Sequence, residues 1–501
     1  MPKAALLGIA GAGLFVAALD AYVVVTLLPT MAGDVGLTFE HFERATPIVT
    51  GFLAGYVVAM PLLGAYSDMR GRVPVYAACM SGFVVGSAMT ATAGLWDFAG
   101  LPWLVAGRFV QGLGGGGLVP LSLALAADMY RERARTLALG SVAALQEAGS
   151  VFGPLYGAWL AAMAAGAGGW RFVFWLNLPL AAICTVALVF GSRATISAAT
   201  EDRSTIDWIG ALLLGAGLGL LVLALYPDDP DHHAVNALFV PAGALAVAVL
   251  GTYAWRQVRQ LEPLIPRDLL RSRAFVGATA ANLLIGAALI VTLVDVPLLG
   301  RLVFNLDQLQ SGLLLTQFLI GVPVGAVAGG LVASRVGNRP TAALGILVSA
   351  LAFVQMSGWR ADELSLHSGP FRDADLALAL CGLGFGLVIA PLTAAVLALT
   401  RGQSHGLATS LVVLARTIGM LVGLVALTAF GLHRFHVILG TPVITDPDLR
   451  TRLKHLQDLV AAAFLQEYRE IFLIAGALCT AAAIVIVLSL TRPAAARPSA
   501  L

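Results

Sequence analysis

The chain has 501 residues, of which 59% are hydrophobic and 12% charged, and its mean hydropathy is +0.88. Soluble domains carry about 25% charged residues, and a helix needs about 20 apolar residues to cross a bilayer, a length that recurs here from end to end. The composition therefore excludes a soluble protein and predicts a polytopic α-helical membrane protein without a separate soluble domain. The formal net charge of +2 says little about partners. All four cysteines lie in apolar runs, where packing is expected rather than disulfides: Cys79, Cys184, Cys381 and Cys479.

The apolar runs predict fourteen membrane spans. The first is too long for the core of a signal peptide, so we interpret it as a span. In chain order the expected spans cover residues 4–30, 45–66, 73–95, 103–128, 136–160, 172–192, 207–226, 237–256, 274–299, 309–334, 341–358, 375–398, 406–431 and 471–491. If Lys3 is cytoplasmic, 18 of the 30 Lys and Arg residues lie in cytoplasmic segments and 10 in outer segments. This asymmetry predicts that both termini face the cytoplasm.

Five charged residues lie well inside these spans, away from their end positions: Asp20, Arg108, Glu147, Asp295 and Arg416. A carboxylate at the bilayer centre costs roughly 2.5–3.5 kcal/mol even on the lower scales, so such groups face a bundle interior and often mark proton or substrate routes. The alternative is a fixed ion pair, for example an acid with Arg108. A carboxylate that alternates between an apolar environment and an arginine would bind and release a proton. We therefore expect proton coupling or state switching here, with Asp20 the first candidate and Glu147 the second.

A short basic turn occurs twice. The chain reads GAYSDMRGRVP from Gly64 to Pro74 and GLVASRVGNRP from Gly330 to Pro340, a constant offset of 266 residues. The glycines allow a tight turn, and the charges of the first copy can clamp neighbouring helix ends in one of two states. The second copy has Ser334 in place of Asp68, so we expect a weaker clamp there. The repeat predicts two six-helix bundles, residues 1–192 and 274–501, with two extra helices in 193–273.

Glycine patterns mark two other spans. Gly149, Gly153 and Gly157 are spaced by four, so they share one helix face and allow another helix to approach closely, while Pro154 would kink or weaken that helix. The run Gly112–Gly117 contains the G-x-G-x-x-G pattern of dinucleotide sites, but it lies inside a span rather than after a strand. Helix packing is the expected role of both patterns.

These segments resemble the major facilitator superfamily. GAYSDMRGR is similar to its signature loop, in which Gly64, Asp68, Gly71 and Arg72 match the pattern. RFVQGLGGGG (108–117) resembles its fourth-helix motif, EAGSVFGPLYG (147–157) its antiporter motif, and LDAYVVVTLLP (19–29) the first-helix pattern of fourteen-span drug:proton antiporters. The resemblance implies the major facilitator fold, and a hinge role for the glycine face of the antiporter motif.

Within the family, the chain is most similar to mycobacterial triacylglyceride exporters, which work with a periplasmic lipid-binding lipoprotein. Tyr22 and Val25 replace the polar residues typical of drug antiporters, and further similar stretches are 291–300, 382–392 and 411–423. The resemblance implies proton-coupled lipid export from the inner membrane of a bacterium towards the periplasm, with such a lipoprotein as partner, and we expect the protein to be a monomer. A polyspecific multidrug:proton antiporter is the alternative, and a passive scramblase stays open.

Other classes fit less well. The two lysines, Lys3 and Lys454, lie in no P-loop, which argues against an ATP-driven pump. The histidines all fall in expected loops or the outer segment, which argues against an embedded enzyme or metal site, and no cofactor is expected.

The segment 432–470 is far longer than the other outer connections. Asp446-Pro447 is a good helix start, and Leu449, Leu453, Leu456, Val460 and Phe464 recur at helical spacing. We expect the last span to begin early and to project about 20 Å or more beyond the membrane, with the preceding span beside it and a turn at 440–443. A helix lying flat on the lipid surface is the alternative.

Overall fold

The computed structural model describes residues 2–35, 45–95, 100–163, 169–192, 207–225, 238–260, 263–306, 308–365, 367–368, 371–399, 405–439 and 449–490. Almost all of these residues are helical. The helices are α1 (Lys3–Asp34), α2 (Thr46–Arg70), α3 (Arg72–Thr92), α4 (Leu101–Met129), α5 (Glu132–Met163), α6 (Gly169–Ser192), α7 (Trp208–Leu225), α8 (Phe239–Arg259), α9 (Arg267–Arg271), α10 (Arg273–Leu302), α11 (Gln308–Leu314), α12 (Thr316–Val336), α13 (Asn338–Met356), α14 (Asp373–Leu397), α15 (His405–Leu439) and α16 (Leu449–Ser489).

One small non-helical element joins α13 to α14. A 3-10 turn, η2 (Glu363–Ser365), precedes β1 (His367–Ser368) and β2 (Phe371–Arg372). The two strands pair antiparallel, with His367 opposite Arg372. The expected all-α class is confirmed apart from this hairpin.

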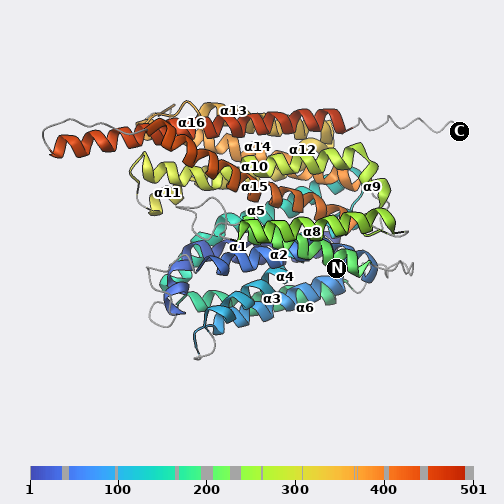
Figure 1. Cartoon of the computed structure of the whole chain (residues 1–501). Coiled ribbons are helices and arrows are strands. Elements are labelled where there is room, and N and C mark those ends of the chain that lie inside the picture. Colours follow the sequence, from blue (N-terminus) through green and yellow to red (C-terminus); the bar gives the residue numbers. More distant parts are fainter. Residues whose placement is uncertain are drawn as a thin grey trace.

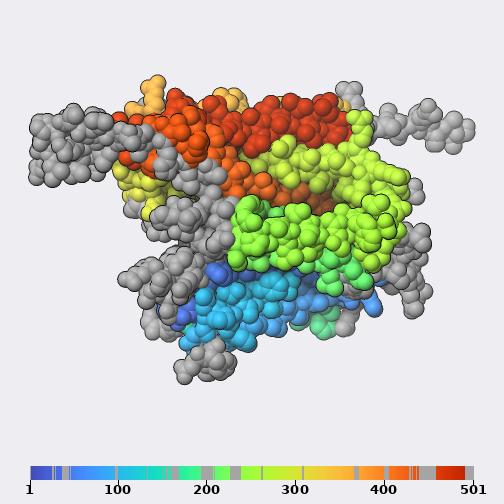
Figure 2. Space-filling model, in the orientation of Figure 1, coloured from blue at the N-terminus to red at the C-terminus, as the bar shows by residue number. Residues whose placement is uncertain are grey.

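The helices form two bundles with α7 and α8 between them (Figure 1). We call α1–α6 the N-terminal bundle and α10–α16 the C-terminal bundle. Figure 2 shows α8, in green, lying across the face where the bundles meet. α7 packs against α2, where a methyl group at Gly215 or Gly219 would meet the side chain of Val58. The chain is thus arranged as two bundles and two extra helices, as the repeat predicts.

Twelve helices of the described chain are long and apolar enough to cross a membrane, which makes this a multi-pass membrane protein. α5 runs beside them, and α7 adds the shorter apolar stretch Ile209–Leu225. Together these helices correspond to the fourteen expected spans, but the count of fourteen crossings stays a prediction. The expected span 309–334 is interrupted at Leu315, between α11 and α12.

The glycine run of α4 packs against its neighbours, as predicted. A methyl group at Gly112 or Gly116 would overlap the carbonyl oxygens of Phe52 and Tyr56 on α2. One at Gly114 would lie 2.5 Å from the carbonyl oxygen of Cys79 on α3. These glycines therefore bring three backbones together, and the G-x-G-x-x-G pattern is a packing feature.

α1 begins and α16 ends at the same end of the bundle, on the right of Figure 1. We call this the inner end, because the positive-residue asymmetry predicts it to be cytoplasmic. Both copies of the repeated turn contain a glycine with positive φ, 91° at Gly71 and 104° at Gly337, where a side chain would be strained. The repeat seen in the sequence is therefore also a repeat of backbone geometry.

Candidate functional site: an inner gate and two buried ion pairs

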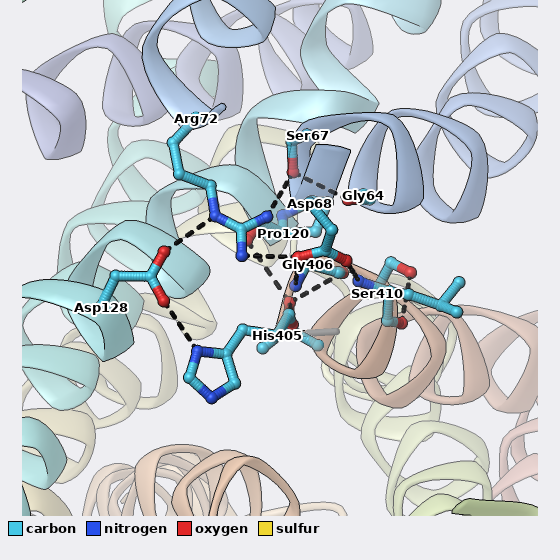
Figure 3. Close-up of polar contacts among 11 residues, drawn as sticks. Gly64, Ser67, Asp68, Arg72, Pro120, Asp128, His405, Gly406 and Ser410 are labelled. Carbon is cyan, nitrogen blue, oxygen red and sulfur yellow. Dashed lines mark hydrogen bonds and ion pairs between the residues drawn. The ribbon is translucent and has the colours of Figure 1, made fainter. Parts of the chain in front are cut away.

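The signature turn holds the two bundles together at the inner end (Figure 3). Asp68, in the last turn of α2, forms an ion pair of 2.5 Å with Arg72 of α3. Its two carboxylate oxygens also accept hydrogen bonds of 3.0 Å from the backbone N–H groups of Gly406 and Leu407. These N–H groups belong to the first turn of α15, where intrahelical acceptors are missing and the helix dipole favours an anion. Asp68 therefore caps a helix of the opposite bundle.

Two residues that we did not predict complete this contact. The carboxylate of Asp128, in the last turn of α4, accepts from Arg72 Nε at 2.9 Å. Its other oxygen lies 2.7 Å from Nδ1 of His405, the first residue of α15. The interpretation of His405 as a loop residue was wrong, because α15 begins one residue before the expected boundary. Asp128 gave no signal, because an acid at the predicted end of a span is a common solvated residue.

The bundles touch backbone to backbone at the same place. A methyl group at Gly64 would lie 2.6 Å from the carbonyl oxygen of Gly406. We call Gly64, Asp68, Arg72, Asp128, His405 and Gly406 the inner gate. In the second copy of the turn, Ser334 Oγ donates within α12, to the carbonyl oxygen of Leu331 at 2.7 Å. The absence of Asp there leaves this turn without the helix-capping role of Asp68.

The first buried ion pair lies within the N-terminal bundle. Arg108 of α4 donates to Asp20 of α1 at 2.8 Å, and these side chains are 1% and 0% exposed. Asn177 of α6 donates to the second carboxylate oxygen of Asp20 at 2.6 Å. Arg108 also donates to Gln111 at 2.7 Å, and its guanidinium lies 4.4 Å from the ring centre of Phe52. This geometry is that of the fixed ion pair considered as the alternative in the sequence analysis. Asn177 was not predicted from the sequence, because a single Asn in an apolar run has many structural roles.

The second buried ion pair joins the two bundles. Arg416 of α15 donates to Glu147 of α5 at 3.1 Å. These side chains are 14% and 17% exposed, so this pair is more accessible to solvent than the Asp20–Arg108 pair. Tyr22 and Tyr56 lie within electrostatic range of it. Since one partner belongs to each bundle, the pair exists only while the bundles are close at this depth.

Asp295 lies apart from both pairs. It is on α10, within electrostatic range of Glu467 on α16. Glu467 is buried, and its Oε2 has no hydrogen-bond partner within the described structure. In the same described part, no group of three or more His, Cys, Asp or Glu side chains is placed to hold a metal ion.

The glycine face of the antiporter motif packs against α1. A methyl group at Gly149 would lie 2.7 Å from the carbonyl oxygen of Phe15, and one at Gly153 would lie 2.7 Å from that of Leu19. The expected close helix approach is therefore confirmed at these two positions. Pro154 and Gly157 lie in α5, which continues as a helix to Met163. Pro154 thus does not end the helix.

α16 extends past the other helices at the outer end, and α15 packs beside it (Figure 1). α16 has 41 residues, about 60 Å at 1.5 Å per residue, against about 30 Å of hydrocarbon. Phe435 stacks on Phe464 with ring centres 4.3 Å apart. Arg434 donates two hydrogen bonds of 2.6 Å to Glu470, which raises the pKa of the Arg434 guanidinium. We call residues 430–439 and 449–470 the outer helical pair.

The expected early start of the last span is confirmed, as is the extension of α15 beside it. The expected helix start at Asp446-Pro447 and the turn at 440–443 lie outside the described residues.

Comparisons with known proteins agree with this architecture. The sequence profile described as Major Facilitator Superfamily matches residues 10–424. The triacylglyceride transporter of Mycolicibacterium smegmatis is 41% identical over 486 residues, covering 93% of this chain and 84% of that protein. The triacylglyceride transporter of Mycobacterium tuberculosis (strain ATCC 25618 / H37Rv) is 40% identical over 484 residues, covering 93% of this chain and 90% of that protein.

Solved structures show the same fold at low identity. The human organic anion transporter MFSD10 has a TM-score of 0.62 at 17% identity, over 96% of this chain and 100% of that one. The proton:xylose symporter XylE has a TM-score of 0.60 at 13% identity, over 96% and 94% of the two chains. Fold, profile and relatives agree on a transporter rather than an enzyme: the chain belongs to the major facilitator superfamily.

Proposed function

We propose that this transporter exports a triacylglyceride-like lipid from the inner membrane towards the periplasm, driven by protons. Relatives with about 40% identity over more than nine-tenths of the chain are named triacylglyceride transporters. The observation that carries the mechanism is the Glu147–Arg416 ion pair, at 3.1 Å, because it joins the two bundles inside the membrane region.

Transport proceeds by alternating access. Residues 1–192 and 274–501 are the two moving halves, and residues 193–273 connect them. Asp68 and Asp128 each reach from the N-terminal bundle to the start of α15, so the inner gate is closed in this structure. With both termini cytoplasmic, a closed inner gate corresponds to the outward-facing state. Opening inward must break these contacts, and Gly71 allows the turn that carries them.

Glu147 is the proton switch of this scheme. The ionised carboxylate attracts Arg416 and favours the closed inner gate, whereas the protonated acid loses most of that attraction. A proton that arrives from the periplasm releases the pair and lets the gate open inward. Release of the proton to the cytoplasm restores the pair and returns the lipid-loaded protein to the outward-facing state. Proton entry and lipid exit are thus opposite halves of one cycle.

Asp20, Arg108 and Asp295 have supporting roles. The Asp20–Arg108 pair lies within one bundle, so bundle motion alone does not separate it. Its function is to orient α1 against α4, next to the α1–α5 contact made by Gly149 and Gly153. Asp295 neighbours Glu467 at the base of the outer helical pair, where Glu467 is buried.

The outer helical pair guides lipid towards a periplasmic lipid-binding lipoprotein, and the monomer is the transporting unit. Support comes from the length of α16 and from the aromatic contact between Phe435 and Phe464. An extended pair of helices offers a lipid an apolar surface beyond the headgroups, which a short loop does not.

Reconstituted transport tests this function. Purified protein in proteoliposomes is given labelled triacylglyceride or, in a parallel series, a cationic dye, and transfer out of the membrane to an acceptor lipoprotein is followed. We expect acceleration of lipid transfer and little transport of the dye. Dye transport without lipid transfer would identify a multidrug antiporter instead.

A further inference from the structure

The chain bends at the inner end of the protein between α8 and α10, and the short helix α9 lies in this bend (Figure 1). We call residues 255–273 the inner elbow. Its sequence, WRQVRQLEPLIPRDLLRSR, has five arginines against one glutamate and one aspartate, which gives a formal charge of +3. The bend is therefore basic, and neither the inner gate nor the buried ion pairs use this charge.

The inner elbow lies on the surface that faces lipid. α8 is the least buried of the twelve membrane-crossing helices of the described chain, with 11% of its apolar stretch buried, and it lies on the surface in Figure 2. Near its inner end, Trp255 and Val258 are 58% and 74% exposed. A tryptophan at the end of a membrane helix is typical of the headgroup level of the bilayer. The arginines beside Trp255 therefore lie at the depth of the lipid phosphates.

Polar contacts hold the inner elbow in one shape. The side chain of Gln257 is buried and donates to the carbonyl oxygen of Ile265. Arg267, the first residue of α9, donates hydrogen bonds of 2.7 Å to the carbonyl oxygens of Val258 and Gln260. These contacts fold α9 back onto the last turn of α8. A ligand that binds here meets a preformed surface and does not have to order the chain.

Two of the five arginines have partners inside the protein. Arg256 pairs with Asp207 at 2.9 Å, and Arg267 makes the backbone contacts just described. The other three are exposed and form no ion pair within the described part of the chain: Arg259, Arg271 and Arg273. The guanidinium of Arg259 lies 4.6 Å from the ring centre of Trp255, so a charged group and an interfacial aromatic ring form one unit. Three positive charges thus face the headgroup region without a partner.

The chemistry of these groups indicates the ligand. A guanidinium is permanently charged, and its planar fork can bind a phosphate with two hydrogen bonds. A zwitterionic headgroup also brings an ammonium group, which three arginines repel, whereas an anionic headgroup brings none. We propose that the inner elbow binds the headgroup of an anionic phospholipid of the adjacent leaflet, with Arg259, Arg271 and Arg273 as the phosphate-binding residues. This lipid stays in the bilayer and is not the transported substrate.

The position of the site gives the bound lipid a role. The Arg256–Asp207 pair ties α8 to the start of α7, and α7 packs against α2 of the N-terminal bundle. The inner elbow itself continues into α10 of the C-terminal bundle. A bound headgroup therefore anchors the connection between the two bundles to the membrane surface.

Lipid enrichment beside the inner elbow tests the proposal. A fluorescent donor is placed on Thr252→Cys, an exposed position about one helical turn before Trp255, in the full-length protein. Cys184→Ser removes the one cysteine that is not fully buried. Nanodiscs of phosphatidylcholine receive small fractions of an acceptor lipid labelled on its acyl chain, either phosphatidylglycerol or phosphatidylcholine. Energy transfer then measures how strongly each lipid gathers beside α8.

We expect phosphatidylglycerol to be enriched over phosphatidylcholine at the donor. A basic residue near an anionic lipid surface strengthens the attraction about fivefold. The triple variant Arg259→Gln, Arg271→Gln and Arg273→Gln should therefore lower the preference for phosphatidylglycerol by roughly tenfold or more. Millimolar inorganic phosphate should leave the enrichment unchanged, because a lipid already in the leaflet is present at a far higher local concentration. Loss of the enrichment in phosphate would assign these arginines to a soluble anion and overturn the proposal.

The matched control removes the same charge at the same end of the protein but outside the inner elbow, by Arg70→Gln, Arg335→Gln and Arg339→Gln. It should keep most of the preference. Equal losses in the two triple variants would reduce the effect to the general positive charge of the inner end and overturn the proposal, as would equal enrichment of both lipids in the unsubstituted protein.

The thermal midpoint shows whether the triple variant is folded. If it is not, Arg271→Gln alone should lower the preference about fivefold, and an unchanged preference would overturn the proposal. Because no transport is measured, these outcomes leave the lipid-export proposal to its own test.

Discussion

The substitution Gly64→Ala should open the inner gate without harming the fold. The added methyl group would lie 2.6 Å from the carbonyl oxygen of Gly406, whereas ordinary contacts begin at about 3.4 Å. The clash involves backbone on α15, so no side-chain rotation relieves it. The two helices must separate by about 0.8 Å, the difference between these distances.

This separation has a cost that can be worked out. The hydrogen bonds from Gly406 and Leu407 to Asp68, now 3.0 Å, would lengthen beyond hydrogen-bonding distance. Hydrogen bonds to a charged group contribute about 1.5–3 kcal/mol each. Loss of both hydrogen bonds would destabilise the closed gate by about 3 kcal/mol or more, which lowers the closed-to-open ratio roughly a hundredfold. Ala is a better helix former than Gly by about 1 kcal/mol, so α2 itself is not weakened.

Spin labels replace Arg70 and Arg335, exposed residues at the inner ends of α2 and α12, and pulsed EPR distances between them give the closed-to-open ratio of the gate. The thermal midpoint of unfolding shows whether the variant is folded. Gly8→Ala is the control, because a methyl group at Gly8 meets nothing within 4 Å. A closed fraction in Gly64→Ala equal to that of Gly8→Ala would refute the reasoning.

Two further predictions concern other parts of the molecule. Asp20→Asn leaves the buried guanidinium of Arg108 without its counter-charge, which should cost about 3–5 kcal/mol of stability and lower the thermal midpoint. The control is Asp34→Asn, at a carboxylate that is 42% exposed, which should cost far less stability. Equal losses of stability in the two variants would contradict a buried Asp20–Arg108 pair. Replacing residues 437–463 by a short Gly/Ser linker removes most of the outer helical pair but keeps its base. The protein should still fold, but lipid transfer to a lipoprotein should stop. Undiminished lipid transfer would show that the outer helical pair does not guide lipid.

The architecture could be predicted because it depends on local physics. The length of each apolar run predicted the helices, and the distribution of Lys and Arg residues predicted their orientation in the membrane. The spacing of the glycines predicted the close helix packing found at Gly112 and Gly153. Glycine destabilises the interior of a long helix, so it is expected there where the backbone of a neighbouring helix must approach closely.

The site was predicted only in part, because its pairs are set by tertiary contacts. Glu147 and Arg416 are separated by 269 positions, and no spacing rule relates them. Hydropathy marked each as a buried charge but could not tell which acid meets which arginine. Asp128 and His405 lie at helix ends, where a boundary error of one residue decides whether a polar side chain is solvated or buried.

The most direct test of the account is a simultaneous record of lipid and proton movement. Proteoliposomes that contain a pH-sensitive dye and labelled triacylglyceride are given an imposed pH gradient, and lipid transfer to an external lipoprotein is followed. The account predicts that the gradient accelerates transfer, that protons move in the opposite direction to the lipid, and that Glu147→Gln abolishes both effects while the protein stays folded. Equal transfer rates with and without the gradient, or a gradient response that survives Glu147→Gln, would contradict it.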